Sequence, residues 1–228
     1  MQELRGKKAV EDDRKVRSEG KSAGFFEADS AVRSGCANLR IWLTAGVGLA
    51  ADLWSKCWAV AVLGRWSRGE GGAWMDGERL SGLYGWAVER FGQPNQGHPE
   101  GITVIQDTVM FYLGFNKGAS WGIAAGQTKL LLIGSGVAML FMLWLYVSLR
   151  RQQRIGQIAL GMLFAGALGN TYDRVFNAGR VVDFIRVDLR VWPANPWPTF
   201  NVADSLLCVG VAMLMLSLLF GQKGKENV

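Results

Sequence analysis

Three long runs without a charged side chain dominate the hydrophobic pattern of the chain. Leu130–Leu149 contains twenty residues, and Ile155–Tyr172 and Ser205–Gln222 contain eighteen each. A helix needs roughly 20 mostly apolar residues to cross the hydrocarbon core of a bilayer. We therefore predict a transmembrane helix in each run.

A fourth apolar run, Ile41–Gly64, is interrupted by Asp52 and Lys56. Residues four apart lie on one face of a helix, so these two side chains are expected to neutralise each other. With this run as the first span, the pattern predicts a mainly α membrane protein with four transmembrane helices. The expected organisation is a mobile cytoplasmic tail (1–38), a four-span domain (39–222) with extramembrane loops at about 64–127 and 175–199, and a cytoplasmic C-terminal tail (223–228).

The two extramembrane loops carry the patterns of a short helix and of strands. Leu80–Phe91 has an amphipathic pattern, and Ile102–Phe115 is rich in the β-branched and aromatic residues that favour strands. In the second loop, alternate residues from Val181 to Val191 are apolar except for Asp183, and the charged residues from position 186 onwards occupy the opposite face. A carboxyl group on the apolar face of a strand points inward, where desolvation raises its pKa.

Composition narrows the class of function. Half of the residues are hydrophobic and the net charge is +6, but the basic residues form no stripe interleaved with aromatic residues, so we expect no nucleic-acid partner. Three cysteines give no disulfide framework. The single histidine, His98, falls in an expected loop without a Cys/His cluster, so the sequence predicts no metal site, no cofactor and no Ser–His catalysis.

The basic residues near the span ends predict the orientation. Three arginines occupy the turn 150–154 between the second and third spans, and both tails are basic, so this side is expected to be cytoplasmic. Arginines at 180, 186 and 190 in the outer loop oppose this bias. The outer membrane surface then collects residues from distant segments: Asn116, Gly118, Asp173, Asp183 and Asp204.

Asp183 and Asp204 are the two carboxylates best placed for chemistry. Each also has a purely structural explanation: a buried Asp183 that accepts backbone hydrogen bonds, and an Asp204 that stabilises the start of the last span behind Asn201. Two carboxylates that share one site, however, titrate as a pair, one ionised and one neutral near neutral pH. The ionised member takes a proton from water as the water attacks a carbonyl, and the neutral member polarises that carbonyl.

Five motifs occur in order between Leu39 and Phe220. They are Asp-Leu-Trp-Ser-Lys (52–56), Asn-Lys-Gly-Ala-Ser-Trp-Gly (116–122), Gly-Asn-Thr-Tyr-Asp-Arg (169–174), Val-Val-Asp-Phe-Ile (181–185) and Phe-Asn-Val-Ala-Asp (200–204). Together they resemble the motifs of the lipoprotein signal peptidase family (signal peptidase II). A single motif of this length would be weak evidence, but five in the family's order make the resemblance specific.

The resemblance implies a four-span bundle with a small extracytoplasmic β cradle in the bacterial cytoplasmic membrane. It implies an aspartyl protease whose partners are membrane lipids and diacylglyceryl-modified prolipoproteins, cleaved before the lipidated cysteine. We expect a monomer with both termini in the cytoplasm and its active site at the outer leaflet.

The resemblance also implies a role for each matching residue. Asp183 and Asp204 match the catalytic dyad, and Asp52 and Lys56 match a first-span pair with a structural or substrate-orienting role. Arg174 is expected to pair with Asp173, with a hydrogen bond to a substrate carbonyl as the alternative. The polar residues that match those shaping the site and holding the substrate are Asn116, Gly118, Asn170, Asp173, Arg174 and Asn201.

Some features depart from the family pattern. Trp121 stands where Phe is usual and Leu53 where Gln is common. The N-terminal tail is long, and Arg65–Gly101 resembles an insertion that we expect to cover or widen the cleft.

Two other functions stay open. One is a transport or ion-relay protein that uses the same aspartates, although relays place acids near mid-span. The other is an inactive relative that binds lipidated peptides without cutting them.

Overall fold

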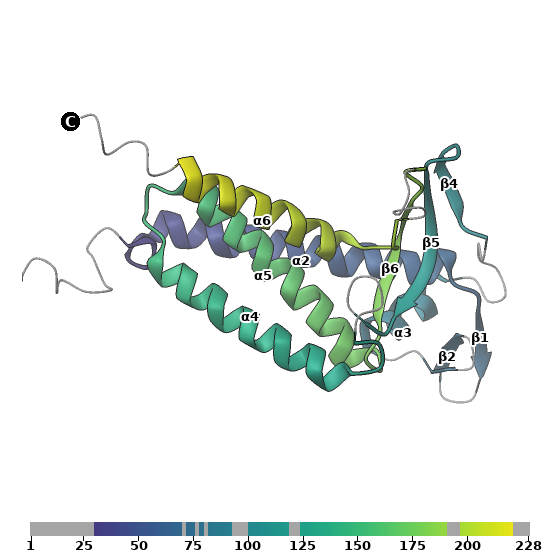
Figure 1. Ribbon diagram of the computed structural model, residues 1–228. Coiled ribbons are helices and arrows are strands. Elements are labelled where there is room, and N and C mark those ends of the chain that lie inside the picture. The colour runs from purple at the N-terminus through teal and green to yellow at the C-terminus, as the bar shows by residue number, and fades with distance from the viewer. Residues whose placement is uncertain are drawn as a thin grey trace, which may run out of the picture.

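The computed structural model describes residues 30–69, 72–75, 78–79, 82–92, 100–118, 124–190 and 197–220. Its long helices run lengthwise, side by side, and the strands gather with the short helix α3 (Gly82–Phe91) at one end of this bundle (Figure 1). The long helices are α2 (Gly35–Leu63), α4 (Thr128–Ser148), α5 (Arg154–Phe176) and α6 (Val202–Phe220).

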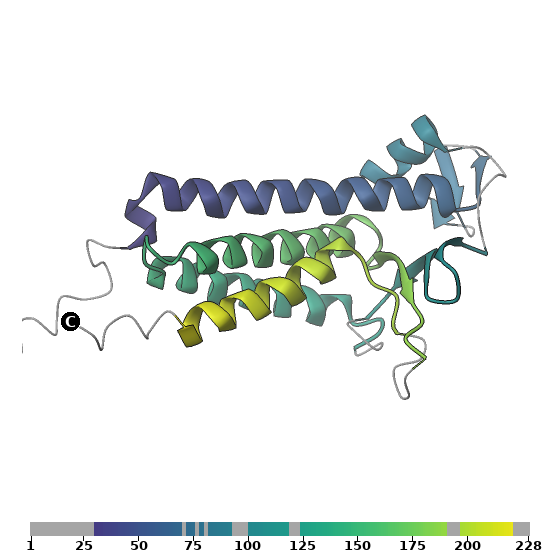
Figure 2. The same ribbon diagram turned by 90° about the horizontal axis from the view of Figure 1, so that it is seen from above.

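Three of these helices, α2, α4 and α6, are long and apolar enough to cross a membrane. Helix α5 has a similar length but is less apolar, and it packs against all three of the others (Figures 1 and 2). Twelve of its residues are buried, whereas in α4 only Met142 is buried. Because neighbouring helices cover α5, its surface does not need to be apolar all round. The fold is that of a multi-pass membrane protein, with three helices identified as spans by composition.

Glycines on α5 let its neighbours approach closely. A Cβ atom added at Gly161 would lie 2.6 Å from the carbonyl oxygen of Ile41 on α2, and one added at Gly166 would lie 2.5 Å from that of Ala203 on α6. Small residues at helix–helix contacts are how membrane helices bring their backbones together. These two glycines therefore set the distances of α2 and α6 from α5.

Two small antiparallel sheets lie at the end of the bundle that carries α3. The first has the order β1-β2-β3 and the second the order β4-β5-β6. Strand β6 follows α5 in the chain and pairs with β5, so the second sheet is tied directly to the bundle. The strands are β1 (Trp66–Gly69), β2 (Gly72–Met75), β3 (Glu78–Arg79), β4 (Ile102–Ile105), β5 (Val109–Asn116) and β6 (Val181–Val187).

The N-terminal boundary predicted from sequence is wrong. Helix α2 begins at Gly35, not near position 39, because the Ser34 side chain accepts a hydrogen bond from the Ala37 N–H and caps the helix. Before it, Ala31 is fully buried, and its N–H donates to the carbonyl oxygen of Leu149 at 2.8 Å. Residues 30–38 therefore belong to the bundle. The rest of the predicted tail, 1–29, and the C-terminal tail, 223–228, lie outside the described residues.

The predicted extramembrane helix and strands are present. The strand that carries Asp183, however, differs from the predicted alternation of apolar and polar residues. Strand β6 ends at Val187, so its alternation does not extend to position 191. Its first half is buried on both faces, since Val182 and Phe184 are as inaccessible as Asp183. The face with Val182 packs against α2 and α3, and the opposite face carries Asp183.

Substituting Gly166 by Ala is expected to destabilise the bundle by about 1–3 kcal/mol, because the new methyl group meets backbone that cannot move aside. Gly46→Ala on α2 is the matched control, since a Cβ atom there meets nothing within 4 Å. The control should keep or slightly raise the stability, as Ala is the better helix former. Thermal unfolding in detergent, followed by tryptophan fluorescence, measures both. Equal melting temperatures for the two variants would contradict this close contact.

Candidate active site

A fully buried ion cluster lies inside the bundle near the sheet. Lys56 Nζ is 2.8 Å from Asp52 Oδ2 and 3.0 Å from Asp173 Oδ2, and all three side chains are inaccessible to solvent. Asp52 and Lys56 lie four residues apart on α2, as the sequence predicted, and Asp173 comes from the last turns of α5. Two carboxyl groups therefore share one ammonium group.

Hydrogen bonds from three other elements reach this cluster. The N–H of Ala203, at the start of α6, donates to Asp52 Oδ1 at 2.8 Å. The N–H of Val182 on β6 donates to Asp173 Oδ2 at 2.9 Å, and the hydroxyl of Tyr84 on α3 donates to Asp173 Oδ1. Buried charge is tolerated only when its oxygens are satisfied in this way. The cluster consequently fixes α6, β6 and α3 relative to α2 and α5.

The predicted ion pair between Arg174 and Asp173 is wrong. Asp173 pairs with Lys56, while the Arg174 guanidinium donates to the carbonyl oxygens of Asn170 and Gly118 at 3.2 and 3.1 Å. Consecutive residues of a helix point about 100° apart, so Asp173 can face the bundle interior while Arg174 faces the segment that follows β5.

Two asparagines connect the ion cluster to Asp183 and Asp204. Asn170 Oδ1 accepts hydrogen bonds from Lys56 at 3.3 Å and from Asn201 at 3.2 Å, and Asn170 Nδ2 donates to Asp204 Oδ1 at 2.8 Å. Asn201 Nδ2 also donates to Asp183 Oδ1 at 2.8 Å. The two aspartates are thus held by adjoining amide side chains of one network.

Asp204 lies in the first turn of α6 and forms a reciprocal cap with Asn201. Asn201 Oδ1 accepts the Asp204 N–H at 2.9 Å, and Asp204 Oδ2 accepts the Asn201 N–H at 3.2 Å. This is the structural role that the sequence allowed for Asp204. It leaves the carboxylate at a helix N-terminus, where the backbone dipoles stabilise negative charge.

Asp183 has a different environment. Its side chain receives hydrogen bonds from Asn201 and from Asn116, whose Nδ2 lies 3.1 Å from Asp183 Oδ2, and the residue is 2% exposed. Burial raises the pKa of Asp183 to about 7, and the negative charge of Asp204 acts in the same direction. Asp183 therefore gains or loses its proton near neutral pH.

Both aspartates line a cleft of about 430 Å³. Its polar wall comes from the network just described, and its apolar wall comes from the segment before α6 and from the first turns of that helix. The lining residues are Asn116, Gly118, Asn170, Arg174, Val181, Asp183, Trp197, Pro198, Thr199, Phe200, Asp204, Ser205, Cys208 and Val209. In the described ranges, no three His, Cys, Asp or Glu side chains are grouped to hold a metal ion.

Most of the residues singled out in the sequence come together here. Six line the cleft, and Asn201, Asp52, Lys56 and Asp173 lie buried beneath it. The prediction missed the apolar wall, although Ser205, Cys208 and Val209 follow Asp204 at helical spacing. It also missed Tyr84, for which the sequence gives no signal.

The expectation that the segment 65–101 covers or widens the cleft is not supported in its described residues. None of them lines the cleft. Helix α3 lies beside the end of α2, on the side away from α6 (Figure 2), and its buried residues contact Val182 on the other face of β6.

Apolar helices that suit a bilayer and a cleft lined by two aspartates are features of a membrane-embedded enzyme. The chain belongs to the signal peptidase II family, since residues 82–220 match the model of "Signal peptidase (SPase) II". The resemblance stated from the motifs is thereby confirmed, which favours a peptidase over a transport protein.

Named relatives and solved structures agree with this family. The chain is 44% identical over 105 residues to "Lipoprotein signal peptidase" of Syntrophotalea carbinolica, covering 45% of this chain and 63% of that protein. It is 33% identical over 146 residues to the Desulfitobacterium hafniense protein of the same name, covering 62% and 92%. A bacterial membrane enzyme solved by the in meso method at 2.3 Å superposes with a TM-score of 0.57 at 25% identity, covering 82% of this chain and 92% of that one.

Replacing Lys56 by Met is expected to cost about 3–5 kcal/mol of stability, because Asp52 and Asp173 lose the cation that both require. Arg190→Met is the matched control, since Arg190 pairs with Asp107 at 3.4 Å where both side chains are mostly exposed. An exposed pair contributes about 0–1 kcal/mol. Thermal unfolding in detergent compares the two variants, and a Lys56→Met protein as stable as the control would disprove the role of the cluster.

Proposed function

We propose that the protein is an aspartyl endopeptidase that removes signal peptides from diacylglyceryl-modified prolipoproteins by cleaving before the lipidated cysteine. The observation that carries this proposal is that Asp183 and Asp204 line one cleft and are bound by adjoining asparagines. Family membership supports the substrate class.

The two aspartates activate water as a pair. We assign the shared proton of the free enzyme to Asp183, since burial raises its pKa to about 7, and the role of base to Asp204. Asp204 takes a proton from the water molecule as its oxygen attacks the scissile carbonyl carbon. Asp183 donates a hydrogen bond to the carbonyl oxygen as negative charge develops there, and the proton held by the pair then passes to the leaving nitrogen.

The other polar residues hold the pair and the substrate. Asn116 and Asn201 orient the Asp183 carboxyl, and Asn170 orients that of Asp204. Arg174 lines the cleft, and its Nε is buried without a hydrogen-bond partner among the described residues. We assign this N–H to a carbonyl oxygen of the bound substrate, since an unpaired buried donor is costly without one.

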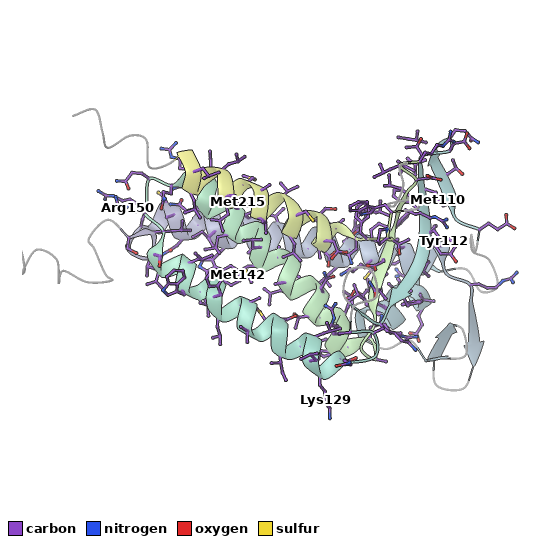
Figure 3. The ribbon with its side chains drawn as sticks, viewed as in Figure 1. Met110, Tyr112, Lys129, Met142, Arg150 and Met215 are labelled. Atoms are coloured by element: carbon purple, nitrogen blue, oxygen red, sulfur yellow. The ribbon has the colours of Figure 1, made fainter. Side chains whose placement is uncertain are left out.

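In the proposed placement in the cytoplasmic membrane, α5 spans the bilayer together with α2, α4 and α6. These four spans leave both termini in the cytoplasm. Arg150, in the turn between α4 and α5, lies at the end of the bundle opposite to Met110 and Tyr112 of β5 (Figure 3). Arginine-rich turns favour the cytoplasmic side, so the sheet and the cleft face outward. A substrate anchored by its lipid is confined to the same layer, which lowers the entropic part of the barrier. We expect a monomer surrounded by lipid.

Asp183→Asn and Asp204→Asn are each expected to lower cleavage by at least 10²–10⁴-fold, roughly the contribution of a positioned acid or base. The assay follows the gel shift of a purified diacylglyceryl prolipoprotein as its signal peptide is released. Globomycin, the inhibitor that the family resemblance suggests, should block the wild type. Asp107→Asn is the matched control, because Asp107 is exposed and its φ of 56° suits Asn. Substantial activity in either dyad variant would contradict the mechanism.

The pKa of Asp183 predicts two effects of pH. The rate constant kcat/KM should fall above about pH 7, as Asp183 loses the proton that it shares. The folded pKa exceeds the ordinary value of 3.8, so this proton stabilises the folded state below about pH 4, and the contribution is lost as the pH rises through about 7. The melting temperature of the wild type should therefore fall over this range relative to Asp183→Asn. A constant difference between the two proteins would refute the raised pKa.

A further inference from the structure

Tyr84 is a buried residue of α3 that the proposed mechanism does not use. It is 2% exposed and packs in a cluster with Cys57, Val60, Val88 and Val182. A phenylalanine would fill the same space, so packing alone does not require a hydroxyl group. That hydroxyl donates a hydrogen bond to Asp173 Oδ1.

Asp173 joins Tyr84 to both catalytic aspartates. Its other oxygen, Oδ2, accepts the N–H of Val182, the residue directly before Asp183, and lies 3.0 Å from Lys56 Nζ. Lys56 in turn donates to Asn170, whose amide binds Asp204. Any rotation of the Asp173 carboxylate thus moves the backbone that carries Asp183 and the lysine that orients Asn170.

The hydroxyl is suited to hold this carboxylate in place. The ion cluster carries two carboxylates and one ammonium group without access to water, so Asp173 needs a strong neutral donor at Oδ1. Burial and the charge of Asp173 raise the pKa of Tyr84, so the hydroxyl keeps its proton at any pH suitable for an assay. The donor is therefore permanent.

We propose that α3 positions the catalytic pair from behind the sheet, and that Tyr84 is the positioning residue, acting through Asp173. This inference rests on the proposed peptidase function. Helix α3 falls in the segment 65–101 that resembled an insertion, but it lies within the residues 82–220 that match the family model. The role assigned to it is support of the dyad, distinct from closure of the cleft.

Tyr84→Phe is the direct test, with cleavage of the diacylglyceryl prolipoprotein as the first measurement. We expect kcat to fall about tenfold, the effect of losing one hydrogen bond to a charged group, with KM unchanged because α3 does not line the cleft. Val88→Ala is the matched control. It removes packing from the same face of α3, so it should lower the melting temperature and leave kcat unchanged.

Hydrogen exchange provides a second measurement that needs no turnover. Loss of the Tyr84 hydroxyl should accelerate exchange in peptides that cover β6 more than Val88→Ala does at equal loss of stability. Tyr84→4-aminophenylalanine keeps the ring and a donor, and should restore both kcat and protection. If Tyr84→Phe does not fold, the kcat and the β6 protection of the 4-aminophenylalanine variant, compared with those of the wild type, test whether a donor at this position is sufficient.

The outcomes separate this inference from the proposed function. If the wild type cleaves and Tyr84→Phe matches it in kcat and in exchange of β6, the positioning role is overturned and the peptidase stands. If the folded wild type cleaves no prolipoprotein, the proposed function fails, and the exchange measurement alone decides whether Tyr84 holds β6.

Discussion

One lysine between two aspartates, all without access to water, is the interaction on which the rest of the structure depends. Removing an ion from water costs several kcal/mol unless partners replace the solvent. Lys56 cannot satisfy every oxygen of Asp52 and Asp173, so the remaining positions need N–H and O–H donors. These donors come from the start of α6, from β6 and from α3. The electrostatic requirement of the cluster thereby determines where the elements that carry Asp183 and Asp204 lie.

The same network gives two identical side chains different environments. Asp204 is bound by backbone and side-chain N–H groups at the beginning of a helix, where negative charge is stabilised. Asp183 lies on a strand that is buried on both faces, where desolvation favours the neutral acid. Carboxyl groups whose environments favour opposite protonation states are suited to act as acid and base in one step. The difference originates in the secondary structure that carries each residue.

Local signals predicted a good part of this arrangement. The charge-free runs located the helices, the spacing of Asp52 and Lys56 predicted their ion pair, and Asn201 marked the start of α6. The pairing of Arg174, the burial of β6 on both faces and the hydrogen bond of Tyr84 could not be predicted in the same way. Each depends on which distant element packs on a given face, and one sequence carries no signal for that.

The lower apolar content of α5 is a consequence of the site it carries. Asn170 and Asp173 cannot face lipid without unsatisfied polar groups, so their helix must be covered by other helices. The neighbouring helices can pack closely on α5 only where α5 has small residues at the contact. Gly169 shows this most directly, because a Cβ atom there would collide with Asp52 Oδ2, so a larger residue would displace the carboxylate that binds Lys56. Helices α2 and α6 also carry polar residues of the site, but Lys56 and Asp204 bind Asp173 and Asn170 of α5, so the outer surfaces of α2, α4 and α6 can be apolar. The covered position of α5 among the other three long helices thus follows from the polar residues of the site that it carries.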